Sequence, residues 1–382
     1  MKLAALCDFP FWSGRIGTGV RFDSLCRSLA RICDLTVICT APMEPQFSAF
    51  AAAAPYRLVA GEELEARDPG TPPLPGVKPH RKAAVRAITH LVSSERIDAV
   101  LTPYFNRSWM TQALPPHVVR ILDTHDCQSQ RTRSLLRHGL VPTFCMHPDE
   151  EGTALADYDI ALAMSLEDQS EFAALCDIPV LTAPFRLPVR DLAPIRPVYR
   201  PPDATDRTLL FIAAQSPVND FTLDYLLRQI MPLVPGPTIL RVIGNVTMPE
   251  DVVLPGCTIE RHENVPDLVP LYAQTDVALN PTFAGGGVKT KTLEAMAYGV
   301  PVVTCDEGAR GLRPLLPEAC IANDKESFAH RAGQLLDAPA RRAALAAEVM
   351  DRMRAEPSDA WLAPFAALLK AAVSTKRDRA AA

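Results

Sequence analysis

The chain has 382 residues, a length that corresponds to two domains and at most three. Hydrophobic residues make up 48% and charged residues 22% of it, so enough apolar surface exists to form a core, which excludes disorder as the main state. The 39 basic and 44 acidic side chains give a formal net charge of −5, which offers no case for a dedicated nucleic-acid-binding protein.

Short apolar runs alternate with helical patterns, which predicts an α/β protein with parallel sheets. Strands are predicted in the first half at 2–7, 34–39, 97–101, 118–122, 159–164 and 179–184. The stretch 186–206 is rich in proline and predicts a semi-rigid linker. Beyond it, strands are predicted at 208–213, 238–243, 276–280, 300–304 and 319–322, then helices at 338–355 and 358–374 and a frayed end from Thr375 to Ala382.

The two halves of the chain resemble each other in one short stretch. Residues 156–162 (ADYDIAL) and 273–279 (AQTDVAL) each indicate the end of a helix running into a buried strand. Two Rossmann-like domains joined by a linker would bind a ligand at the carboxyl ends of their strands.

The N-terminus has no run typical of a signal peptide, and no uncharged apolar stretch is long enough to span a membrane. The ten cysteines lack C-x-x-C spacing, so we expect reduced thiols and a cytoplasmic protein, with peripheral attachment at the inner membrane face left open. One patch is dense in ligand types, but its spacing fits no standard zinc pattern, and no metal site is expected. It consists of His125, Cys127, His138, Cys145 and His147.

The strongest local signal is the glycine loop at Gly285, Gly286 and Gly287, between a predicted strand and a helix over 288–298. The free N–H groups of a helix N-terminus favour an anion. Lys289 and Lys291 lie in the first turn, where the helix dipole disfavours cations, so we interpret them as phosphate ligands. The alternative is a strand–turn–helix with solvated lysines; Val288 before Lys289 rules out a P-loop.

Glu294 is the only acidic residue of this helix. It is either a solvated surface carboxylate or an acceptor for two sugar hydroxyls.

At this point the sequence resembles the retaining glycosyltransferases of the GT-B fold, family 4 type. The segment GGGVKTKTLEAMAYGVPVV at 285–303 carries the resemblance, supported by Leu209 to Asn219, by Leu240 to Gly244 and by Asn264 to Asp276. The match is good over about 205–310 and loose over 1–185, where Asp123-Thr124-His125-Asp126 is the clearest element.

The resemblance implies a GT-B fold of two Rossmann-like domains with a cleft between them. It implies an acceptor-binding domain at 1–188, a linker at 189–206, a donor domain at 207–356 and, at 357–382, a crossover helix that returns to the first domain. The implied activity is transfer of a sugar from a nucleotide-diphosphate sugar to a glycan, lipid-linked or other hydroxyl acceptor, in surface polysaccharide or glycoconjugate synthesis. No cofactor is implied.

The resemblance also assigns roles to individual residues. Glu294 would bind the donor ribose, and the backbone of Gly286, Gly287 and Val288 would hold the diphosphate and sugar. His125 would lie near the donor sugar, and with Lys289 and Glu294 it forms the expected catalytic set. The remaining expected donor ligands are Gly285, Lys291, Thr292, Asn219 and Gly244, and the expected N-terminal loop is Gly14, Gly17, Thr18 and Gly19.

Two departures from the family pattern stand out. A first glutamate commonly precedes the second by eight positions, and Gly286 stands there. The usual Arg and Lys after the first strand of the donor domain are missing from 213–219, so Lys289 or Lys291 would supply that charge. Because the helix N-terminus and the lysines can stabilise the leaving diphosphate, we expect transfer without a divalent metal.

Two other functions remain open: a GT-B nucleotide-sugar 2-epimerase and a catalytically silent GT-B-like binding or chaperone subunit. A basic stretch at 78–137 holds ten Lys and Arg against four Asp and Glu, a local charge of +6. It is either a solvated surface or a contact with an anionic membrane.

Overall fold

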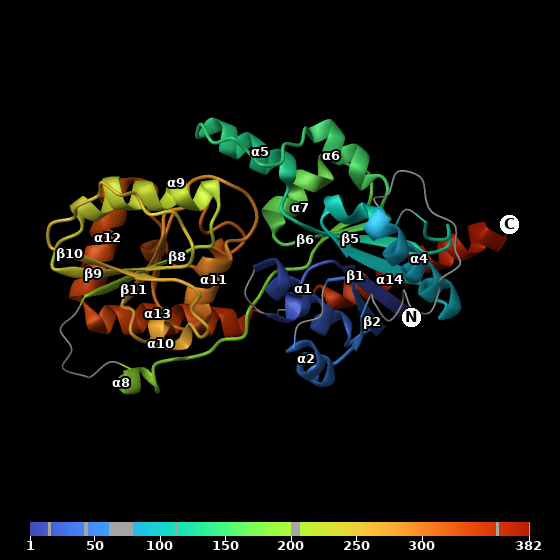
Figure 1. Ribbon diagram of the computed structural model, residues 1–382, viewed down its shortest axis with the longest axis horizontal. Helices are drawn as coiled ribbons and strands as arrows, with labels where there is room; N and C mark the ends of the chain where they lie inside the picture. The colour runs from blue at the N-terminus through green and yellow to red at the C-terminus, as the bar shows by residue number, and fades with distance from the viewer. Residues whose placement is uncertain are drawn as a thin grey trace. The chain divides into compact units, whose positions relative to one another are not determined.

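The computed structural model describes residues 1–13, 17–41, 45–60, 79–111, 113–199, 207–356 and 359–381 (Figure 1). Its contacts divide the chain into two compact units. Unit 1 comprises Met1–Cys127, Met146–Arg186 and Ser358–Ala382, and unit 2 comprises Gln128–Cys145 and Leu187–Pro357.

Unit 1 is built on a seven-stranded sheet of order β3-β2-β1-β4-β5-β6-β7, in which every pair is parallel. Its strands are β1 Lys2–Cys7, β2 Asp34–Cys39, β3 Arg57–Ala60, β4 Ala99–Pro103, β5 Val119–His125, β6 Ile160–Ala163 and β7 Val180–Thr182. The central strands are buried along almost their whole length, as expected for a parallel sheet covered on both faces. The order reverses between β1 and β4, so a ligand crevice is expected at their carboxyl ends.

The helices of unit 1 are α1 Gly17–Leu29, α2 Phe47–Ala53, α4 Pro79–Ser94, α6 Pro148–Leu155, α7 Leu166–Ala173 and α14 Leu362–Ala381, with 3₁₀ turns η1 Phe11–Ser13 and η2 Phe105–Met110. The C-terminal helix α14 packs on this unit. Phe365 and Leu369 are fully buried in the core that contains Phe22 and Leu25 of α1. Lys376 also pairs with Asp159 at 2.7 Å.

Unit 2 is built on a five-stranded parallel sheet of order β10-β9-β8-β11-β12. Its strands are β8 Thr208–Ile212, β9 Thr238–Ile243, β10 Cys257–His262, β11 Val277–Asn280 and β12 Val302–Thr304. Its helical segments are α5 Gln128–Arg137, α8 Arg196–Tyr199, α9 Pro217–Tyr225, η3 Leu226–Ile230, η4 Met231–Leu233, α10 Val269–Ala273, α11 Thr290–Ala297, η5 Arg313–Leu315, η6 Glu318–Cys320, α12 Lys325–Asp337 and α13 Pro339–Ala355. In Figure 1, α9 and α13 lie on opposite sides of this sheet.

Most predicted strands are present, and the exceptions have physical reasons. The predicted strand at 319–322 is wrong: it is the turn η6 followed by a single bridge between Ile321 and Thr304. The strands β3 and β10 were missed because both are edge strands with little continuous apolar sequence. The predicted fraying after Thr375 is also wrong, because α14 continues to Ala381, where Lys376 and Arg377 form ion pairs with unit 1.

Among the described residues, no helix is long and apolar enough to cross a membrane.

Candidate active site

The glycine loop lies at the switch point of the second sheet. Strand β8 is at the centre of the sheet, between β9 and β11, so the loops that follow β8 and β11 leave the sheet side by side. The loop after β11 carries the three glycines and feeds α11. Gly285 and Gly287 have φ values of +126° and +66°, which residues with a side chain rarely adopt.

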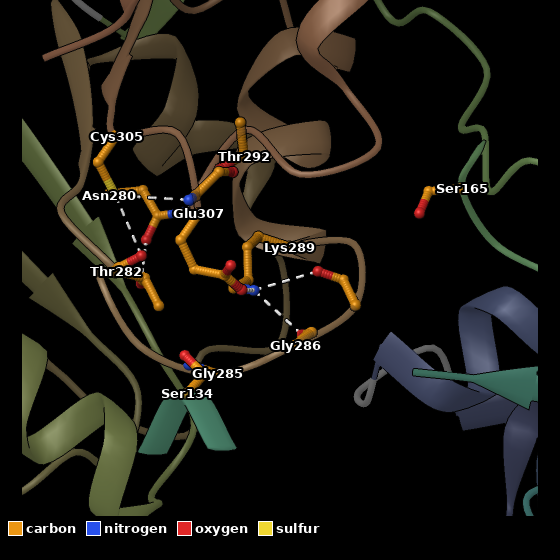
Figure 2. A network of polar contacts seen from close by, with 12 residues as sticks. Ser134, Ser165, Asn280, Thr282, Gly285, Gly286, Lys289, Thr292, Cys305 and Glu307 are labelled. Atoms are coloured by element: carbon orange, nitrogen blue, oxygen red, sulfur yellow. Dashed lines mark hydrogen bonds and ion pairs between the residues drawn. The ribbon is translucent and has the colours of Figure 1, made fainter. Parts of the chain in front are cut away.

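A buried chain of hydrogen bonds fixes the base of this loop (Figure 2). Thr282 donates its hydroxyl to Asn280 Oδ1 at 2.5 Å, Asn280 Nδ2 donates to Thr292 Oγ1 at 2.6 Å, and Thr292 donates to the carbonyl of Gly308 at 2.9 Å. All three side chains are almost completely buried. A fully satisfied buried network is rigid, so the loop has a defined shape before any ligand binds.

Lys289 is folded back onto the loop itself. Its Nζ donates to the carbonyls of Gly286 and Gly287 at 3.0 and 3.1 Å and pairs with Glu307 at 2.6 Å (Figure 2). An ammonium group has three protons, and these contacts occupy all of them. In this arrangement Lys289 holds the loop in shape and Glu307 offsets its charge.

Lys291 points instead toward the loop after β8. Its Nζ donates to Asn219 Oδ1 at 2.8 Å and lies 5.2 Å from the centre of the buried Phe211 ring. Burial, together with the charge of Lys289, lowers the pKa of Lys291 to about 7. Asn219 is itself held in the first turn of α9, where its backbone N–H donates to the cap residue Ser216.

Glu294 is largely buried within α11. It accepts a hydrogen bond of 2.9 Å from the hydroxyl of Tyr272, a fully buried side chain of α10. Burial raises the pKa of the Glu294 carboxyl, and the Tyr272 hydrogen bond opposes that shift. The carboxylate is therefore oriented by the protein and is not the solvated group of the alternative interpretation.

Helix α5 covers part of the glycine loop. The N–H of Gly285 donates to Ser134 Oγ at 3.1 Å (Figure 2). A Cβ placed on Gly286 would lie 2.9 Å from Gln130 Oε1 and 3.0 Å from Arg131 Cβ. Gly286, where the resemblance leads one to expect a glutamate, therefore lies at a point where α5 approaches the loop backbone closely.

Some of the other expected donor ligands have contacts that stabilise the fold around the loop. Thr292 has its hydroxyl engaged within the buried network, and Val288 is 8% exposed. Gly244 has a φ of +102°, and a Cβ there would lie 2.1 Å from the Ala213 carbonyl oxygen, so only glycine fits between the ends of β8 and β9.

In unit 1, His125 ends β5 with a φ of +62°, next to Tyr104, which follows β4 with a φ of +59°. The two rings are stacked at 3.8 Å. His125 Nε2 lies 3.3 Å from Asp123 Oδ2, and the buried Asp123 pairs with the buried Arg21 of α1 at 2.9 Å. Two non-glycine residues in strained conformations on adjacent strand ends are typical of a functional site.

Gly17, Thr18 and Gly19 are not in a loop: they form the first turn of α1. Gly19 lets this helix approach Phe11, since a Cβ there would lie 3.0 Å from Phe11 Cα. The Thr18 hydroxyl is 3.0 Å from the Tyr104 hydroxyl, which links this turn to the His125 region. Gly14 lies outside the described residues.

In the part of the chain that the structure describes, no three His, Cys, Asp or Glu side chains form a metal-binding group. The one Asp-x-Asp sequence, Asp157-Tyr158-Asp159, is not assembled as such a site. Asp159 accepts from the backbone N–H of Arg120 at 2.7 Å and pairs with Lys376.

Sequence reasoning missed several partners of the expected site residues. Asp123 was named in the motif that contains His125 but not as its partner, and Asn280 could have been found as a polar strand end next to the glycine loop. Tyr272 lies in the stretch Asn264 to Asp276 that supports the resemblance, but its contact with Glu294 was not predicted. Glu307 and Ser134 carry no local signal, because they reach the site from other elements.

Comparison with known proteins finds a family match within the second unit. Residues 206–338 match the model of the family described as Glycosyl transferases group 1. No curated protein sequence matches the chain.

Solved structures extend the similarity over both units. TarM of S. aureus has a TM-score of 0.71 at 7% identity, covering 96% of this chain and 98% of its own. HepE of Anabaena, solved with UDP, has a TM-score of 0.58 at 13% identity, with 92% and 94% covered. WaaG, a glycosyltransferase involved in lipopolysaccharide biosynthesis, has a TM-score of 0.60 at 14% identity, with 97% and 99% covered.

The two parallel sheets and these structures establish the GT-B fold. With the family match of the second unit, they make the protein a glycosyltransferase and support transfer of a sugar from a nucleotide sugar.

Proposed function

We propose that the protein is a retaining glycosyltransferase of the family 4 type, which transfers a sugar from a nucleoside-diphosphate sugar to an acceptor hydroxyl. The observation that carries this proposal is the pairing of Lys291 with Asn219 at 2.8 Å, beside the glycine loop and at the start of α11. It brings a cation and helix N–H groups together at the strand ends where α/β sheets bind nucleotides.

In this proposal the donor diphosphate accepts hydrogen bonds from Lys291 and from the backbone around Gly286, Gly287 and Val288. Glu294, oriented by Tyr272, accepts from the two ribose hydroxyls. Lys289 and Glu307 act on the donor indirectly, because they hold the loop rather than the ligand.

Retaining transfer needs charge stabilisation on the departing diphosphate. Lys291 and the helix N-terminus can supply it, and the leaving phosphate can take the proton of the acceptor hydroxyl. His125, held beside Asp123 and stacked on Tyr104, is proposed to contribute to the transfer step. No divalent metal is required in this mechanism.

The proposed acceptor is a glycan or lipid-linked hydroxyl, and the proposed role is the synthesis of a surface polysaccharide or glycoconjugate. HepE has been solved with UDP and with UDP-glucose, so uridine nucleotides are the first ligands to test.

The test is calorimetry of UDP and GDP binding to the wild type and to Lys291→Met, each with EDTA present. We expect one nucleotide to bind without metal, and Lys291→Met to weaken it about 10- to 100-fold, as for loss of a charge-assisted hydrogen bond. The matched control is Lys325→Met, an exposed lysine at the start of α12, which should bind as the wild type does. Equal binding by Lys291→Met would overturn the assignment, and binding that needs manganese would overturn metal independence.

A catalytically silent binding subunit is the second candidate, favoured by Gly286 and by the Ser134 contact with Gly285. Donor binding without any hydrolysis or transfer, across a panel of acceptors, would favour it over the transferase. Interconversion of a UDP-sugar with no acceptor present would instead indicate an epimerase.

A further inference from the structure

The stretch from Cys127 to Pro148 contains basic side chains and no acidic ones. It contains Arg131, Arg133 and Arg137 and the histidines His138 and His147, but no Asp or Glu. It covers α5 and the irregular chain before α6 (Figure 1). Over 133–145, which we name the docking segment, Arg133, Arg137 and His138 are all exposed.

The same segment exposes large apolar side chains. Val141 is 81% exposed, Leu136 58% and Phe144 46%. The described residues contain ten exposed large hydrophobic side chains; three of them fall within nine positions here, and three more, Ile195, Val198 and Tyr199, lie within five positions of one another. Exposed apolar side chains that are scattered singly need no explanation, whereas a cluster does.

We propose that the docking segment attaches the protein to the surface of an anionic membrane. Leu136, Val141 and Phe144 would enter the interface between headgroups and acyl chains, while Arg137 contacts lipid phosphates. Cations and apolar side chains interleaved without any acid are complementary to an anionic lipid surface, and arginine can keep its charge among headgroups while its stem is buried. A protein partner would have to supply the compensating acidic groups and an apolar pocket together.

The docking segment takes the place of the basic stretch 78–137, where the sequence had suggested a membrane contact. Within that stretch Lys78 lies outside the described residues, and the side chains of Arg81 and Lys82 are likewise not described. The docking segment shares only Arg133 to Arg137 with it and adds the apolar side chains that charge counting could not find.

The first experiment is co-sedimentation of the full chain with vesicles of phosphatidylcholine, alone or with about one-third phosphatidylglycerol. We expect binding only to the anionic vesicles. The triple variant Leu136→Asp, Val141→Asp, Phe144→Asp should lower it at least about tenfold, because it removes the apolar contacts and adds three negative charges. Arg137→Gln should lower binding less and should reduce its dependence on salt.

The matched control is Val253→Asp. Val253 is 86% exposed elsewhere in unit 2, with Asp251 two positions away, so its substitution should leave vesicle binding unchanged. UDP binding to the triple variant in solution should equal that of the wild type. The docking proposal and the proposed donor site can therefore fail independently.

Cys145 provides a reporter at the segment itself. It is exposed, whereas Cys176 and Cys257 are half-buried and the other cysteines are buried. A polarity-sensitive dye on Cys145, in a Cys176→Ser, Cys257→Ser background, should shift to the blue with anionic vesicles and not with neutral ones.

Three results would overturn the proposal: equal binding to neutral vesicles, full binding by the triple variant, or an unshifted dye on bound protein. Concentration-dependent dimerisation abolished by the triple variant, with no vesicle binding, would assign the segment to a second copy of the chain instead.

Discussion

Two lysines on one helix turn have different surroundings and therefore different chemistry. Lys289 is neutralised by Glu307 and bonded to loop carbonyls, whereas Lys291 is bonded to a neutral amide over an aromatic ring. The sequence places both in the same anion-binding role. The two lysines differ only in where their side chains point: Lys289 shapes the loop, whereas Lys291 can take up a proton when an anionic ligand binds.

We expect the affinity for a nucleoside diphosphate to fall as pH rises from about 7 to about 8.5. The pKa of Lys291 is lowered to about 7 by burial and by Lys289, so the free protein loses this proton above pH 7. A bound diphosphate raises that pKa, so binding takes up a proton and weakens by up to about tenfold per pH unit. Calorimetry in buffers of different ionisation enthalpy measures this uptake.

Lys291→Arg is the control for this pH dependence, because arginine stays charged throughout the range. Its affinity should be flat with pH. A pH-independent affinity in the wild type would show that Lys291 does not respond to the diphosphate.

The buried Arg21–Asp123 pair is the second feature at this scale. Asp123 is fully buried between Arg21 and His125, so neutralising it leaves a buried charge without its partner. Asp123→Asn should therefore destabilise the protein by roughly 3–5 kcal/mol in denaturant unfolding.

Replacing the whole pair distinguishes packing from function. Arg21→Met with Asp123→Leu should recover most of that stability, because the pair is exchanged for apolar groups of similar volume. Sugar transfer should stay low, because His125 has lost its carboxylate neighbour. Transfer at the wild-type kcat in the double variant would contradict a positioning role for Asp123.

At the scale of elements, the site depends on how α5 meets the glycine loop. Ser134 accepts from Gly285 N–H, and a side chain at Gly286 would require Gln130 and Arg131 to shift. This close contact is a physical reason for glycine at position 286. Gly285 and Ser134 are 151 residues apart in sequence, so no local pattern could reveal this contact.

Gly286→Ala should reduce donor affinity by about two- to tenfold, because the added methyl group pushes Gln130 and Arg131 off the loop. Gln130→Ala in the same chain should recover part of the loss, since its Oε1 is the nearest clashing atom at 2.9 Å. A double-mutant cycle of UDP affinities measures this coupling. Strictly additive effects would mean that α5 does not constrain the loop.

At the scale of the whole molecule, the C-terminal helix belongs to the core of the unit that begins the chain. Phe365 and Leu369 of α14 are buried with residues of α1, although more than 330 residues separate them in sequence. Unit 1 is thus complete only when the last 20 or so residues have been added, and unit 2 has a core of its own.

Phe365→Ala should destabilise unit 1 by about 3–5 kcal/mol, the usual effect of removing a fully buried phenylalanine. Hydrogen exchange followed by mass spectrometry should show faster exchange in β1, β4 and β5 and unchanged exchange in β8, β9 and β11. An exposed position of the same helix, Lys370→Ala, is the control. Equal loss of protection in both sheets would mean that the two units unfold as one.

The sequence by itself determined the class of fold and the location of the glycine loop. Buried parallel strands need continuous apolar runs, and β1, β2 and β9 were predicted with their observed bounds. A glycine turn that feeds a helix N-terminus is likewise a local feature, and so Gly285–Gly287, Lys291 and Glu294 could be found from their spacing. Edge strands were missed because little of their surface is buried and their apolar pattern is weak.

Only the tertiary structure decided what each side chain contacts. Tyr272, Glu307, Asn219 and Ser134 come from four different segments and converge on the glycine loop and on α11. His125 stacks on Tyr104, which follows β4, and lies beside Asp123, which pairs with Arg21 of α1. Such contacts depend on which strands are neighbours and on where α5 packs, which are long-range consequences of burial. Local propensity carries no information about them, and this is why the loop was predictable while its chemistry was not.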